Sequence, residues 1–126
     1  MADFFAESKI KLNLVTQIPP YPYDIPNCLR SALYRGLDAA ETCKLSYDDF
    51  LASTNPVNNI INDLAASHPN ITLIRPEESL CDGVSCISVI GNQPLYRDDD
   101  HLSTMGSSFI SDLFAPVFQN SGAAPK

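Results

Sequence analysis

A carboxylate and a histidine stand three positions apart in the most polar stretch of the chain, which reads Tyr96-Arg97-Asp98-Asp99-Asp100-His101-Leu102-Ser103. In a tight turn, this spacing lets the carboxylate of Asp98 accept the imidazole N–H of His101. The second ring nitrogen is then free to act as a base, as a Ser-His-Asp triad requires. Taken alone, however, the spacing is more typical of a solvated acidic loop that carries an incidental histidine.

Regular elements must position this loop, and the hydrophobic pattern predicts them in a definite order. Strands alternate with helical segments, so the pattern predicts a βαβ unit with parallel strands, followed by a small hairpin and a last helix. The predicted elements are a strand over 10–18, a helix from Pro26 to about Gly36, a short helix over 46–52, a helix that begins at Pro56, a strand over 71–74, a hairpin around Gly91-Asn92 and a helix over about 104–115.

Three details of these helices are specific enough to test. Asn55 is expected to cap the helix that begins at Pro56. Ser103 is expected to cap the last helix, which Pro116 ends or kinks. The apolar stripe expected to face the core of the Pro56 helix consists of Val57, Ile60, Ile61, Leu64 and Ala65. Residues 1–120 are expected to form one domain portion, with 121–126 as a disordered tail.

Composition excludes several classes of function. The 126 residues are 44% hydrophobic, which fits one globular domain. Eight basic residues against fifteen acidic ones give a net charge of −7, which argues against nucleic acid or an anionic membrane as a partner. No apolar run approaches the ~20 residues that span a bilayer, and the first residues do not resemble a secretory signal.

The four cysteines leave three interpretations open. Disulfides are favoured, because a glycine in the short loop between Cys81 and Cys86 lets the chain turn back, and the simplest second pair is Cys28 with Cys43. Free buried thiols are the second interpretation. Zinc is disfavoured, because the spacing of the first pair and the isolated histidines do not fit a structural zinc site. Disulfides imply an oxidising compartment.

The segment from Leu95 to Gly106, preceded by the two close cysteines, resembles the end of an SGNH (GDSL-type) hydrolase domain. More narrowly, it is similar to the SGNH domain at the C-terminus of acyltransferase-3 family membrane proteins, which resemble O-acetylases of bacterial surface polysaccharides. The resemblance is specific over residues 81–106 and weaker from about residue 10. It implies an α/β fold, a three-layer α/β/α sandwich with a parallel sheet of the SGNH or flavodoxin-like kind.

The same resemblance assigns roles to residues. It places the triad aspartate and histidine on Asp98 and His101, and it implies no cofactor and no metal. The resemblance also implies that Gly106 is a close-packing position beside the loop and that Ser103 only caps the helix. It leaves two roles open for Tyr96, which either belongs to the core or lines the cleft that binds the acyl acceptor.

The family's other blocks do not occur in the printed sequence. The Gly-Asp-Ser block of the nucleophile is absent, and Gly83-Val84-Ser85 and Gly91-Asn92-Gln93 do not replace the missing motifs. The resemblance therefore implies the C-terminal portion of a domain whose N-terminal side, together with a membrane acyltransferase domain, lies upstream of Met1. Such a protein would act at the periplasmic face of the inner membrane, on an acyl donor and a carbohydrate acceptor.

The sequence is compatible with two functions. The first is an acyltransferase or esterase domain acting on O-acyl groups of a polysaccharide such as lipopolysaccharide O-antigen, inactive as this chain alone. The second is a non-catalytic extracytoplasmic module, held by disulfides, that binds a glycan or a protein. In that case Asp98 and His101 are dispensable.

Overall fold

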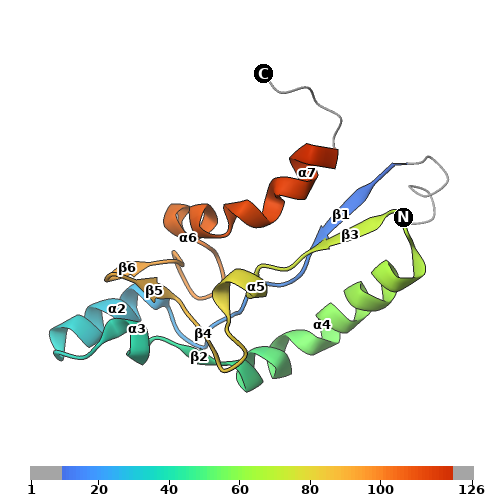
Figure 1. Ribbon diagram of the computed structural model, residues 1–126. Helices are drawn as coiled ribbons and strands as arrows, with labels where there is room; N and C mark the ends of the chain where they lie inside the picture. Colours follow the sequence, from blue (N-terminus) through green and yellow to red (C-terminus); the bar gives the residue numbers. More distant parts are fainter. Residues whose placement is uncertain (1–9, 121–126) are drawn as a thin grey trace.

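The computed structural model describes residues 10–120 (Figure 1). Its elements alternate between strands and helices in the first part of the chain and become short and irregular after β3. In chain order they are β1 (Leu12–Val15), α2 (Ile25–Tyr34), α3 (Ala39–Thr42), β2 (Leu45–Ser46), α4 (Tyr47–Ser67), β3 (Ile71–Ile74), α5 (Glu77–Leu80), β4 (Ser85–Cys86), β5 (Val89–Ile90), β6 (Gln93–Pro94), α6 (Thr104–Phe109), the 3-10 helix η1 (Ser111–Phe114) and α7 (Ala115–Asn120).

The parallel pairing among the described strands joins β1 and β3. β1 pairs with β3 in the register Leu12 to Ile71 through Val15 to Ile74, which confirms the predicted parallel unit. The strand predicted over 10–18 is shorter than expected, because β3 offers only four residues for pairing. In Figure 1, α4 lies on one side of this pair and the segment α6–α7 on the other. This is the predicted α/β class with helical layers on either side of a parallel sheet.

Helix α4 differs from the prediction in its length. Residues 47–67 form one helix whose N-cap is Ser46, so Asn55 caps nothing and Pro56 lies inside. Proline in a helix interior removes one backbone hydrogen bond. Burial of Phe50 and Thr54 on one face continues the helix through this position, and the Thr54 hydroxyl donates to the Phe50 carbonyl at 2.8 Å.

The buried face of α4 also differs from the predicted one. The buried residues are Phe50, Thr54 and Asn58, whereas Val57 is 48% exposed and Ile60 is 69% exposed. The expectation that Val57 and Ile60 face the core was therefore wrong. Phe50, in the first turns of α4, belongs to the main hydrophobic core. Its burial fixes which face of the helix points inward, and this is the face of Thr54 and Asn58.

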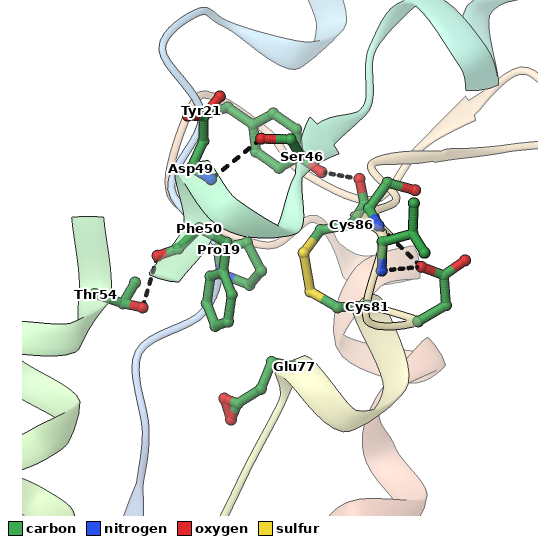
Figure 2. The surroundings of a disulfide bond; sticks show 12 residues. Pro19, Tyr21, Ser46, Asp49, Phe50, Thr54, Glu77, Cys81 and Cys86 are labelled. Carbon is green, nitrogen blue, oxygen red and sulfur yellow. Dashed lines mark hydrogen bonds between the residues drawn. A yellow bond between two sulfur atoms is a disulfide. The ribbon is translucent and has the colours of Figure 1, made fainter. Parts of the chain in front are cut away.

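Both predicted disulfides are present, Cys28–Cys43 and Cys81–Cys86. The second joins the end of α5 to β4, next to the first turn of α4 (Figure 2). The pairing of β2 with β4 holds the same region, and the Tyr47 N–H donates to the Val84 carbonyl at 2.9 Å. The chain that follows β3 is therefore fixed to the start of α4 by both a covalent bond and a short ladder.

The C-terminal part confirms the hairpin and corrects the last helix. β5 and β6 pair across a turn in which Gly91 and Asn92 have φ of 55° and 60°, as a tight hairpin turn requires. The helix predicted over 104–115 is broken into α6, η1 and α7. Pro116 accounts for the second interruption, because it has no N–H and its ring would clash with the carbonyl four residues earlier in a continuous helix, whereas it is accommodated in the first turn of α7. The first interruption, at Ile110, lies too far upstream for this effect. Over residues 10–120, no helix combines the length and apolar character needed to cross a membrane.

Candidate active site

The loop that carries Asp98 and His101 connects β6 to α6 and is closed at its base. Tyr96 and Leu102 form an isolated β-bridge, and the Arg97 N–H donates to the His101 carbonyl at 2.9 Å. The side chain of Ser103 caps α6, as predicted, by accepting from the Gly106 N–H at 3.1 Å. The loop is thus a tight turn set on a strand end and a helix N-terminus.

A second segment holds the loop from the side. The Tyr21 N–H donates to the Asp99 carbonyl at 2.9 Å, and the Ile25 N–H donates to the Asp98 carbonyl at 3.2 Å. These donors belong to the connection after β1 and to the first turn of α2. The loop therefore lies at the carboxyl end of β1, the side on which open α/β sheets usually bind ligands.

Asp98 and His101 point toward one another. The His101 Nδ1 lies 2.8 Å from Asp98 Oδ2, while Asp98 Oδ1 accepts the N–H groups of Asp100 at 2.9 Å and His101 at 2.7 Å. The Asp98 side chain is thereby held in one orientation by the turn it closes. In the neutral ring, a carboxylate at Nδ1 fixes the proton there and leaves Nε2 unprotonated.

Asp100 makes a contact that the spacing did not reveal. Its Oδ1 also lies 2.8 Å from the His101 Nδ1, so two carboxylates face the same ring nitrogen. The His101 side chain is 58% exposed, and Nε2 has no partner among the described residues. The arrangement can therefore hold the imidazole as a base with its accepting nitrogen open to a substrate or a nucleophile.

The same three side chains are the only described group with metal-ligand geometry. One ligand atom each from Asp98, Asp100 and His101 lies within 4.8 Å of the others. Hydrogen bonds already account for this proximity, since both carboxylates meet the Nδ1 proton and Asp98 also accepts two backbone N–H groups. Such exposed groups do not by themselves define a metal centre.

Hydrogen bonds at this turn lower the pKa of Asp98 below its ordinary value, first of all the bond from the Asp100 N–H, with contributions from His101. A carboxyl whose pKa is lower in the folded chain stabilises the fold above its unfolded pKa of about 3.9, and that contribution disappears as pH falls toward the folded value. We expect a carbon-detected NMR titration to give a lower pKa for Asp98 in the folded chain than in the urea-unfolded chain. Equal values would mean that the turn does not hold the carboxylate.

Two neighbouring residues support the loop rather than line a cleft. Tyr96 is fully buried, its hydroxyl donates to the Pro19 carbonyl at 2.6 Å, and its ring meets Tyr21 edge-on at 5.0 Å. Tyr96 is therefore a core residue. Gly106 is a close-packing position, as expected, because a Cβ there would lie 1.9 Å from the Leu95 carbonyl oxygen.

No candidate nucleophile or oxyanion hole accompanies the pair among residues 10–120. No serine hydroxyl there hydrogen bonds to the His101 ring. Ser85 lies in β4, where it pairs with Ser46, and Gly91 and Asn92 form the hairpin turn. The described residues thus bring a carboxylate and an imidazole together without a serine hydroxyl beside the ring.

The described residues form a parallel α/β unit with a carboxylate–imidazole pair in the loop before its last helical segments. The model of one family, the SGNH domain that is fused to AT3 domains, matches residues 1–116, and the chain belongs to this family. No curated protein and no solved structure matches the chain. The association with AT3 domains indicates a membrane-anchored parent protein, and the two disulfides fit an extracytoplasmic location.

Proposed function

We propose that this chain supplies the aspartate and histidine of an SGNH-type acyltransferase or esterase site that acts on O-acyl groups of a bacterial surface polysaccharide of the lipopolysaccharide O-antigen type. The observation that carries the proposal is the 2.8 Å contact between Asp98 Oδ2 and His101 Nδ1, with no partner for Nε2 among residues 10–120. Family membership supports the reaction class. The periplasmic face of the inner membrane is the proposed location.

In the proposed mechanism, a serine outside this chain is the nucleophile, because the printed sequence has no Gly-Asp-Ser block. His101 Nε2 takes the serine proton as the hydroxyl oxygen attacks the acyl carbonyl, and it returns the proton to the leaving group. A sugar hydroxyl then attacks the acyl-serine and loses its proton to His101. The acyl group passes to the sugar oxygen as the bond to the serine oxygen breaks, and His101 returns the proton to that serine oxygen. Water in place of the sugar gives ester hydrolysis.

Asp98 acts in this scheme as a positioning residue. Its carboxylate keeps the Nδ1 proton in place and stabilises the imidazolium that forms when Nε2 is protonated. Asp100 Oδ1 also lies 2.8 Å from this nitrogen, but among the described residues only the Asp98 carboxylate accepts the backbone N–H groups of the turn as well, so Asp98 is the residue proposed to fix the tautomer. The upstream AT3 membrane domain of the parent protein is the proposed partner that presents the acyl group.

We test the proposal with Asp98→Asn in the polypeptide that contains both this domain and its AT3 domain. The asparagine oxygen still accepts the two backbone N–H groups, but its amide presents a donor to Nδ1 and favours the wrong tautomer. We expect the rate of polysaccharide acylation to fall by about 10⁴-fold, as it does when a triad aspartate is replaced.

The matched control is Asp99→Asn, which removes the same charge one position away. Asp99 contacts Tyr21 through its backbone carbonyl, which the substitution keeps. This control should retain wild-type acylation. Unchanged acylation in Asp98→Asn would exclude the catalytic role and favour a non-catalytic module that binds a glycan or a protein.

A further inference from the structure

A hollow of about 390 Å³ lies against the segment that holds the catalytic loop. One wall comes from the connection after β1, and the other comes from β2 and the first turns of α4. Its lining residues are Pro20, Tyr21, Pro22, Leu45, Asp49 and Ser53.

The hollow is joined directly to the loop through Tyr21. The backbone N–H of this residue donates to the Asp99 carbonyl at 2.9 Å, and its hydroxyl donates to the Cys86 carbonyl at 2.8 Å. Figure 2 shows Tyr21 and Asp49 next to one another, although they come from different elements. Two hydrogen bonds therefore hold this wall in place, and the lining residue Tyr21 itself makes the one that anchors the loop.

The lining combines apolar surface with a carboxylate that has no partner. Pro20 and Pro22 present ring C–H groups, and Pro22 is exposed. The Asp49 side chain is exposed, and among the described residues only its backbone groups take part in hydrogen bonds, with Ser46 and Ser53. No lysine or arginine lines the hollow, so it does not favour an anionic ligand.

We propose that this hollow is a subsite for a neutral hexopyranose unit of the acceptor polysaccharide. The C–H face of the sugar packs on Pro20 and Pro22, and the Asp49 carboxylate accepts hydrogen bonds from ring hydroxyls. This inference rests on the proposed function and specifies its acceptor. A uronic acid is excluded from the subsite, because its carboxylate would face that of Asp49.

Binding, measured without turnover, tests the subsite. The full 126-residue chain is titrated with methyl glycosides of glucose, galactose, mannose and rhamnose, and with the methyl glycoside of glucuronic acid, while amide shifts are followed by NMR. We expect at least one neutral glycoside to bind in the millimolar range and to shift the amides of Leu45, Asp49 and Ser53. The glucuronide should bind at least fivefold more weakly.

Two variants test the role of the lining. Asp49→Ala removes the acceptor, and Ser53→Leu fills the hollow, so each should weaken binding at least fivefold. The matched control is Asp48→Ala, which removes a carboxylate from the same first turn but does not line the hollow, and it should bind as the wild type does. Thermal unfolding confirms that each variant is folded.

The outcomes separate this inference from the proposed function. His101→Ala should keep wild-type sugar binding, so a catalytic assignment that fails leaves the subsite standing. Absence of shifts with every neutral glycoside would overturn the subsite, as would equal loss of binding in Asp48→Ala and Asp49→Ala. Binding of sodium hexanoate in place of the glycosides would assign the hollow to an acyl chain and would also overturn it.

Discussion

Replacing His101 by alanine is expected to lower the acylation rate of the AT3-fused polypeptide by about 10⁶-fold, the scale of loss when a triad histidine is removed. Without the imidazole, nothing in the described loop takes the serine proton, since Asp98 and Asp100 meet only the Nδ1 side of the ring. Acylation of the purified polysaccharide, measured by NMR of the acyl signals, gives the rate.

The fold should survive this substitution, which makes the measurement interpretable. The His101 side chain is 58% exposed, and its contacts are the two carboxylates of its own turn. The chain contains one other histidine, His68, which is the C-cap of α4 and provides a matched imidazole deletion. His68→Ala should retain acylation. A loss of less than tenfold in His101→Ala, or rates equally low in both variants, would contradict the role of His101 as base.

The contact between Asp98 and His101 was predictable because it is local. A carboxylate three residues before a histidine meets the ring through one turn, and the same turn satisfies the backbone N–H groups of Asp100 and His101. The close cysteines are local in the same sense, since the turn through Gly83 brings Cys81 and Cys86 together. When a single turn joins two residues, the chain has few other conformations that keep them apart, so their contact can be predicted from their spacing.

The rotation of α4 was not predictable from its own sequence. Its apolar stripe suggested that Val57 and Ile60 face inward, yet Thr54 and Asn58 are the buried residues. The Asn58 side chain accepts the Gln17 N–H at 3.2 Å, so a contact from a segment far away in sequence stabilises this rotation. Tertiary packing outweighs helix periodicity when a polar side chain satisfies a strand-end backbone group.

The hollow beside Tyr21 was invisible in the sequence for a related reason. Its lining comes from two segments far apart in sequence, 20–22 and 45–53, and only the fold brings the prolines after β1 against Asp49 of α4. The contact of Asp100 with the His101 ring was also missed, because three consecutive aspartates give no signal that distinguishes one from the next. Contacts between segments far apart in sequence, and the choice of one aspartate among identical neighbours, are therefore set by the fold and not by the local sequence.

Among the described glycines, Gly106 is expected to show the largest loss of stability on replacement by alanine. The new Cβ would lie 1.9 Å from the Leu95 carbonyl oxygen and 2.9 Å from its carbon. Leu95 cannot move away cheaply, because its N–H donates to Ser88 at 2.8 Å and its carbonyl accepts from Ser103 at 2.9 Å. Relief of the clash requires α6 to leave the strand end.

We expect a destabilisation at or above the upper end of the roughly 1–3 kcal/mol usual for overpacking, a large share of the ~5–15 kcal/mol that stabilises a typical domain. Urea unfolding followed by circular dichroism measures this destabilisation as a lower midpoint with an unchanged slope.

The control is Ser107→Ala, which adds no atoms at the next, exposed position of α6 and should change the midpoint little. Since Leu95 and Ser103 anchor the base of the loop that carries Asp98 and His101, the contact between these two residues should weaken together with the fold. Equal midpoints for Gly106→Ala and Ser107→Ala would mean that α6 does not pack against Leu95, and the support proposed for the loop would have to come from Tyr21 and Ile25 alone.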